Sequence, residues 1–190
     1  MLMKILPSFH LLAMCCAGTL AGHAAPALAA KVPVASAPRS NMSLAGQVFD
    51  AVNAYRRSQG AANLERHAGL DHLAQQHCEY LREHRGSFVL RGKNVSHIGF
   101  EGRAMYARVY YHMDNISENV VAVERAGSNP APTLVALWKA SKDHQKAMVG
   151  TWTHSGLGLV LDTDGTVFSV QLFATVNPSL MVTQSRNNRF

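Results

Sequence analysis

The sequence predicts an α+β domain in which helices come first and a small antiparallel sheet lies at the C-terminal end. Between residues 44 and 141, apolar side chains recur at helical spacing in three segments. From residue 157 to residue 173 the spacing changes to the alternation that is typical of paired strands. Asp164-Gly165 separates the two alternating runs, and this dipeptide between strands indicates a hairpin.

Residues 1–29 have the pattern of a cleaved signal peptide. Lys4 is the only charged residue among them, an apolar stretch follows it, and Ala27-Leu28-Ala29 fits a cleavage site of the A-x-A type. A membrane-spanning helix needs about 20 apolar residues, whereas Pro7 and Gly18 interrupt this stretch. We therefore expect the mature chain to be secreted or periplasmic and to have no transmembrane segment. An uncleaved anchor and a lipoprotein are the alternatives.

The composition excludes a disordered chain and a membrane protein with several spans. Hydrophobic residues make up 47% of the 190 residues and charged residues 16%. The net charge of +6 falls to +5 when Lys4 leaves with the signal peptide. The basic residues are scattered and not interleaved with aromatic ones, so we expect no nucleic-acid partner. The positive charge is compatible with attraction to lipid or to another component of the cell envelope.

Cys78 is the only cysteine left after cleavage, so the mature chain cannot form an internal disulfide. Its side chain is either a small buried apolar group or a thiol that pairs between chains. A mature chain of about 160 residues is large enough to build a core without a disulfide. We expect this chain to be a monomer.

The mature chain is predicted to begin with a linker over residues 30–43, followed by one domain over 44–176 and a flexible tail over 177–190. Ser43 is the expected cap of the first helix. Helices are expected over residues 44–59, 69–85, 104–113, 133–141 and 143–149, and strands on either side of the Asp-Gly turn.

Six short motifs follow one another between Val48 and Ala174. They are, in order, Val52-Asn53-Ala54-Tyr55-Arg56, the spacing of Leu64, Leu70, Leu73 and Ala74, Ser96-His97 with Gly102, Ser117-Glu118-Asn119-Val120, Trp138-x-x-Ser141-x-x-His144, and Gly156-Leu157-Gly158. In this order they resemble the CAP superfamily of cysteine-rich secretory, antigen-five and pathogenesis-related proteins, most closely its bacterial branch without disulfides. The resemblance implies a three-layer α-β-α sandwich, the SCP-like fold, in which helices flank a small antiparallel sheet.

The resemblance also implies a cleft that holds two His and two acidic residues and that binds a divalent metal in some members. His97 matches the first His, Glu118 the first acid and His144 the second His. Ser141 stands at the position of the second acid, so the set of four is incomplete. If Zn²⁺ or another divalent cation binds, His97 and His144 are its expected ligands, with Glu118 nearby. No catalytic residue is assigned.

Three functions remain open from the sequence. The first is a binding module that takes a lipid, another small apolar molecule or an envelope component into the central His/Glu cleft. The second is a divalent-metal-dependent hydrolase that uses His97, Glu118 and His144. The third is a structural factor of the cell envelope, in which these residues form a polar network without chemistry.

Overall fold

The computed structural model describes residues 43–87 and 97–177, which belong to one compact unit of the chain. The predicted signal peptide, most of the linker, the tail beyond residue 177 and Ser96 of the third motif lie outside the described residues. The domain boundaries therefore stay predictions. None of the described helices is long and apolar enough to cross a membrane. The elements in chain order are α1 (Leu44–Ser58), β1 (Glu65–Arg66), α2 (Ala68–Glu83), the 3-10 turn η1 (Arg85–Ser87), α3 (Phe100–Tyr111), β2 (Met113–Val123), α4 (Pro130–Ala140), α5 (Lys142–Val149), β3 (His154–Leu161) and β4 (Val167–Val176).

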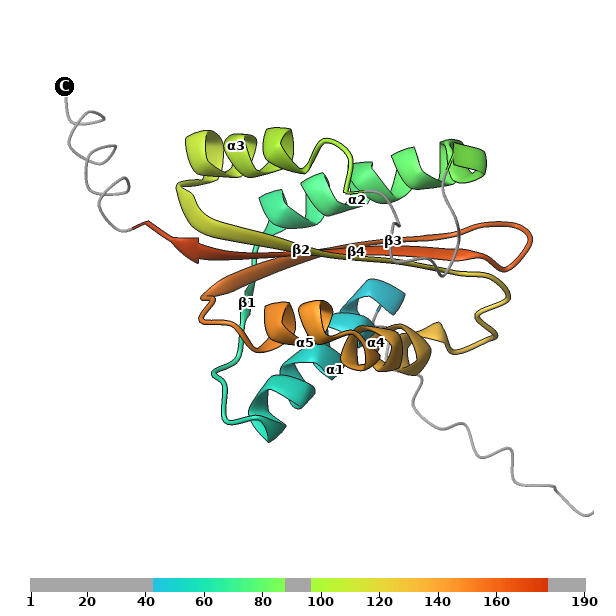
Figure 1. Ribbon diagram of the computed structural model, residues 1–190, viewed down its shortest axis with the longest axis horizontal. Coiled ribbons are helices and arrows are strands. Elements are labelled where there is room, and N and C mark those ends of the chain that lie inside the picture. Colours follow the sequence, from blue (N-terminus) through green and yellow to red (C-terminus); the bar gives the residue numbers. More distant parts are fainter. Residues whose placement is uncertain (1–42, 88–96, 178–190) are drawn as a thin grey trace, which may run out of the picture. The chain divides into compact units, whose positions relative to one another are not determined.

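Four strands form one sheet in the order β1-β3-β4-β2. β4 pairs antiparallel with both β2 and β3, whereas the short β1 runs parallel to β3. Helices α2 and α3 cover one face of the sheet, and α1, α4 and α5 cover the other (Figure 1). The predicted α+β class and the three layers are thus confirmed. The one difference is that the sheet is mixed, not wholly antiparallel.

The sheet is buried on both faces because each helical layer packs its apolar stripe against it. On one side, Leu70 and Leu81 of α2 pack with residues of β2 and β4. On the other side, Val48 of α1 and Trp138 of α4 belong to a second apolar cluster. Every β4 residue from 167 to 174 is buried, so β4 forms the centre of the domain and reads as a continuous run of buried positions.

Helix α2 lies unusually close to strand β3, and two glycines make this possible. A Cβ atom on Gly156 would come within 2.2 Å of the backbone nitrogen of Asp71, and one on Gly158 within 2.4 Å of the carbonyl carbon of Ala74. Side chains of α2 also bond to the edge of β3: Asp71 Oδ1 accepts from Leu157 N at 2.8 Å. One helical turn later, Gln75 Oε1 accepts from Leu159 N at 2.9 Å.

These two bonds complete the edge of β3 beyond the end of β1. β1 pairs only with His154 and Ser155, so the backbone N–H groups further along β3 have no strand beside them. Side-chain oxygens from residues four apart on α2 take the place of that strand, and the edge is thereby closed to other chains. The helix is thus held to the sheet by hydrogen bonds as well as by apolar packing.

The predicted helices are found, but α3 begins four residues before the expected residue 104 and α4 three residues before the expected residue 133. The largest difference lies around residue 112. The apolar, aromatic segment 104–113 was expected to be one helix, but α3 ends at Tyr111 and Met113 begins the long strand β2. His112 adopts a left-handed backbone conformation, with a φ of 55°, that breaks the helix and turns the chain into the sheet. The prediction was wrong here because residues 113–123 show no clean alternation: their C-terminal half is buried on both faces.

Cys78 lies in the core between α2 and the sheet. Burial raises the pKa of its thiol well above the ordinary value, so the thiolate is strongly disfavoured. Of the two interpretations left open by the sequence, the small buried apolar side chain fits this position.

The contact of α2 with β3 predicts a sharp difference between two glycine substitutions. Gly158→Ala places a methyl group against the backbone of α2, so we expect the free energy of unfolding to fall by about 3 kcal/mol or more. Gly86→Ala meets no atom within 4 Å and should change it by less than about 0.5 kcal/mol. Urea unfolding followed by circular dichroism measures both. Equal stability of the two variants would contradict the close approach.

Candidate functional site

The carboxylate of Glu118 on β2 is the centre of the candidate site, and its side chain is buried. The guanidinium of Arg103, on α3, binds this carboxylate through two hydrogen bonds: Nε donates to Oε2 at 2.8 Å and Nη2 donates to Oε1 at 2.9 Å. His97 Nδ1 lies 2.9 Å from Oε1 on the same carboxylate. The guanidinium thus pairs with the buried carboxylate in the bidentate geometry that is typical of strong ion pairs.

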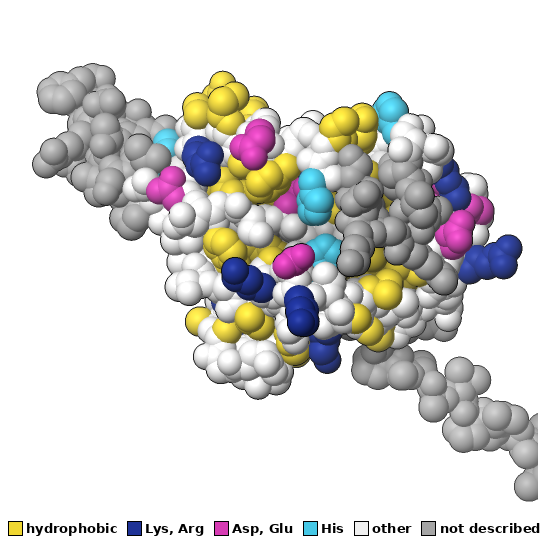
Figure 2. All heavy atoms as spheres, in the orientation of Figure 1, with side chains coloured by type: hydrophobic (Ala, Val, Ile, Leu, Met, Phe, Trp, Pro, Cys, Tyr) yellow, Lys and Arg dark blue, Asp and Glu magenta, His cyan; other side chains and the backbone are white. Residues whose placement is uncertain are grey.

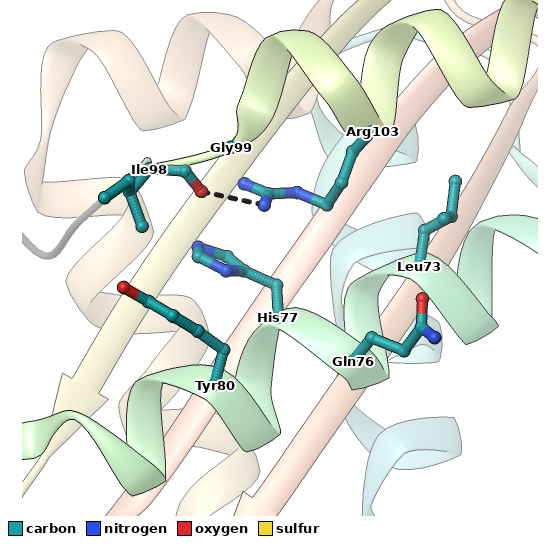
Figure 3. Close-up of a pocket in the computed structure, with 7 residues that line it drawn as sticks. All are labelled: Leu73, Gln76, His77, Tyr80, Ile98, Gly99 and Arg103. Carbon is teal, nitrogen blue, oxygen red and sulfur yellow. Dashed lines mark hydrogen bonds between the residues drawn. The ribbon is translucent and has the colours of Figure 1, made fainter.

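Arg103 also positions the turn that carries His97. Its third nitrogen, Nη1, donates to the carbonyl oxygen of Ile98 at 2.9 Å, as the dashed line in Figure 3 shows. Gly99 follows with a φ of 74°, a left-handed conformation that suits glycine, and it caps α3. Since a carboxylate only accepts hydrogen bonds, His97 Nδ1 carries the hydrogen toward Glu118. The ring therefore keeps Nε2 as the atom that can meet a ligand.

His144 joins the site from the opposite helical layer. Ser141 caps α5, and its Oγ accepts from His144 N at 3.5 Å. Asn119, the neighbour of Glu118 on β2, donates from Nδ2 to the His144 carbonyl oxygen at 3.1 Å. The pKa of the His144 imidazole is lowered, first by burial and then by the nearby His97, with Asp143 acting in the opposite direction. We therefore expect His144 to be neutral at neutral pH.

The residues singled out in the sequence do come together. A hollow of about 650 Å³ is lined by His97, Glu118, Ala140, Ser141, Lys142, Asp143 and His144. Residues from 97 to 144 converge here because β2 carries Glu118 between the turn before α3 and the start of α5. Arg103 was not among the predicted site residues: it directly follows Gly102, the last residue of the third motif, and has no special spacing of its own.

The arrangement does not fit a metal centre with three protein ligands. Both oxygens of Glu118 are engaged by Arg103 and His97, and an adjacent guanidinium opposes the binding of a cation there. Ser141 offers a hydroxyl group that already caps α5. Within residues 43–87 and 97–177, no three His, Cys, Asp or Glu side chains are grouped so that they could hold a metal ion. His97 Nε2, the His144 ring and the Asp143 carboxylate are the donors that remain along this hollow, and they are not grouped as three ligands of one ion.

A second hollow, of about 370 Å³, lies between α2 and the turn before α3. Leu73, Gln76, His77 and Tyr80 of α2 form one wall, and Ile98, Gly99 and Arg103 form the other (Figure 3). Consecutive residues, His97 and Ile98, line the two different hollows, so the turn before α3 and the Arg103–Glu118 pair form a wall between them. We call this second hollow the α2–α3 pocket.

No sequence motif marks the α2–α3 pocket. Apolar residues at helical spacing predict only that the helix over residues 69–85 turns one face to the interior, not that a hollow lies beside it. The ring of His77 stacks on that of Tyr80, and Tyr80 stacks in turn on His84, with centroids 5.9 and 4.0 Å apart. His77 and Tyr80 point from α2 toward the turn before α3 and line the pocket together with Leu73 (Figure 3).

Comparisons with known proteins agree with this architecture. Residues 49–173 match the family model described as CAP, the cysteine-rich secretory protein family. An outer surface protein from Borrelia burgdorferi has the same fold, with a TM-score of 0.54 and 16% identity, over 68% of this chain and 90% of that one. No curated protein matches in sequence.

Two further solved structures are similar at lower TM-scores. A cysteine-rich secretory protein from Staphylococcus aureus is 20% identical, with a TM-score of 0.49 over 75% of this chain. An extracellular protein from Bacillus anthracis that contains an SCP domain is 19% identical, with a TM-score of 0.49 over 70% of this chain. The match spans 40% of each of these two longer proteins.

The Arg103–Glu118 pair predicts strong coupling between two substitutions. Arg103→Met leaves a buried carboxylate without its cation, so we expect the free energy of unfolding to fall by about 3–5 kcal/mol. Glu118→Gln in the same chain removes the stranded charge and should recover a large part of that loss. Thermal and urea unfolding of the two single variants and the double variant measure the coupling. Strictly additive losses would show that the two side chains do not stabilise each other.

Proposed function

Because the chain belongs to the cysteine-rich secretory protein family, we propose that it is a ligand-binding domain that takes up a lipid or another small apolar molecule outside the cytoplasm. The α2–α3 pocket is the observation that carries this proposal. Leu73, Tyr80 and Ile98 give the pocket apolar walls, while Gln76 and His77 place polar groups beside them. Binding sites for small molecules commonly combine apolar walls with a few polar groups that orient the ligand.

The proposal extends the central His/Glu cleft that the sequence indicated. The apolar part of the ligand lies in the α2–α3 pocket, beside the hollow in which His97 Nε2 and His144 are available. The Arg103–Glu118 pair between the hollows acts as a fixed scaffold. It orients His97 and maintains the shape of both hollows without taking part in chemistry.

The alternative of a metal-dependent hydrolase has weaker support. It would use His97, Glu118 and His144, and Glu118 would have to leave the guanidinium of Arg103 to reach a cation. That exchange strands a charge in a buried position, which costs several kcal/mol. The alternative of a structural envelope factor shares the same polar network, but it gives no role to an apolar pocket of about 370 Å³.

Location outside the cytoplasm is part of the same proposal. Residues 1–29 have the pattern of a signal peptide. The protein of known structure with the same fold in Borrelia burgdorferi is an outer surface protein. These two observations support secretion or a periplasmic location, where lipids and envelope components are accessible.

Ligand binding is tested with cis-parinaric acid, a fatty acid whose fluorescence rises in apolar surroundings. We expect the full chain to bind it, and Ile98→Gln to raise the Kd about tenfold, because the substitution puts a polar amide into the pocket wall. The measurement is a fluorescence titration at constant ionic strength.

Val109→Gln is the matched control for this titration. Val109 and Ile98 are both 58% exposed, but Val109 does not line the pocket, so its substitution should leave the Kd unchanged. Absence of binding by the unsubstituted chain, or equal effects of the two variants, would rule out the α2–α3 pocket as the site.

The metal alternative is tested by metal analysis of the full chain. We expect well under one zinc ion per chain after dialysis against zinc and then buffer, because the side chains of His97, His144 and Asp143 that line the hollow are not grouped as three ligands of one ion. A His97→Ala, His144→Ala double variant serves as the comparison. One zinc ion per chain in the unsubstituted protein, lost in the double variant, would favour the hydrolase.

A further inference from the structure

Helix α3 exposes an apolar face that nothing in the described part of the chain covers. Five of the seven large apolar side chains exposed among the described residues lie in or just before this helix, with exposed fractions from 43% to 63%. They are Ile98, Met105, Tyr106, Val109 and Tyr110. In Figure 2 apolar side chains gather over the position of α3, beside a few charged ones. The opposite side of α3 packs on the core through Ala104 and Ala107, so the helix is apolar on both sides.

A surface helix ordinarily turns a polar face to solvent, and an exposed apolar patch usually marks a site of interaction. The arrangement of charge on α3 indicates what kind of surface it meets. Glu101 and Arg108 are exposed, are seven residues apart, and lie along one flank of the apolar face because seven residues make two helical turns. Within residues 43–87 and 97–177, neither of them makes an ion pair.

In contrast to the monomer expected from the sequence, we propose that two copies of the chain dock through α3, with the two helices antiparallel about a two-fold axis. In this arrangement Glu101 of each copy lies opposite Arg108 of the other, which places an ion pair on the same flank at both ends of the contact. The acid stands near the N-terminal end of the helix and the base near its C-terminal end, so the face is complementary to itself only when the helices run in opposite directions.

The same register also pairs the apolar side chains. If residue 101 lies opposite residue 108, the axis passes near Met105, and the two Met105 side chains meet there. Tyr110 then lies over the turn before α3 in the other copy, where Ile98 is exposed. One register thus pairs each Glu101 with an Arg108 and also covers the exposed apolar side chains at both ends of the contact. The parallel arrangement would set Glu101 beside Glu101 and Arg108 beside Arg108, and it would align the helix dipoles unfavourably.

A lipid surface fits this face less well than a second copy. Insertion of Met105 and Val109 into a bilayer would carry the Glu101 carboxylate toward the apolar region without a partner, at a large desolvation cost. Docking of two copies instead gives that carboxylate a guanidinium. The dimer proposal does not depend on the proposed ligand binding. Ile98 lines the α2–α3 pocket and also belongs to the exposed face, so the dimer contact would lie at the rim of the pocket.

The experiment measures the mass of the full chain, expressed with its own N-terminal segment so that any processing occurs, by sedimentation equilibrium. Concentrations from about 1 to about 300 µM cover the weak range expected for a small interface. We expect a monomer–dimer equilibrium. Glu101→Arg alone and Arg108→Glu alone should each raise the dimer Kd about tenfold or more, because each replaces two attractive contacts by two repulsive ones.

Two combinations make the test specific. The double variant Glu101→Arg, Arg108→Glu should regain the dimer, and an equimolar mixture of the two single variants should form a mixed dimer, since every contact in it again joins opposite charges. Arg82→Glu and Glu83→Arg are matched controls, because they make the same charge changes on the exposed side of α2 and should leave the Kd unchanged.

Met105→Glu tests the apolar centre and should abolish the dimer. A chain that stays monomeric over the whole concentration range overturns the proposal. So does a dimer whose Kd responds equally to the α2 controls, or one that the mixture of single variants does not restore. Binding of a monomeric chain to phosphatidylglycerol vesicles that is lost in Met105→Glu would overturn the proposal in favour of a lipid surface.

Discussion

The contact of α2 with β3 is the constraint on which the rest of the structure depends. Gly156 and Gly158 let the helix backbone approach the strand, and Asp71 and Gln75 replace the missing neighbour along the edge of β3. The helix is therefore fixed in position and in rotation, because any other rotation would lose both hydrogen bonds. This rotation turns Leu70 and Leu81 into the core and leaves Leu73, His77 and Tyr80 to form the wall of the α2–α3 pocket.

The second constraint is a buried charge and the way it is neutralised. Glu118 stands where the sequence resemblance implies an acid of a His/acid cleft, and Arg103 holds both of its oxygens. A buried carboxylate must have a partner, and a guanidinium provides one with matched geometry. The result is a group of hydrogen-bonded side chains that orients His97 and lies between two hollows.

Helix α3 connects these constraints to the surface. Its inner side packs on the core, Arg103 reaches from it to Glu118, and its outer side carries the exposed apolar residues. Arg103 also donates a hydrogen bond to the carbonyl oxygen of Ile98, at the edge of the pocket. The edge of the pocket is therefore attached directly to the helix that carries the exposed apolar face. A partner that docks on α3 would therefore lie beside the opening of the pocket, and a ligand in the pocket would lie beside the docking face.

The sequence by itself determined the class of the fold, the faces of the helices, the C-terminal hairpin and the family, since these depend on local periodicity, turn residues and ordered motifs. It also named His97, Glu118, Ser141 and His144, through resemblance. Only the tertiary structure revealed β2, the role of Arg103, the α2–α3 pocket and the outward face of α3. The physical reason is that these features arise where segments distant in sequence meet: β2 is buried by both helical layers, and Arg103 acquires its role only once Glu118 lies beside it.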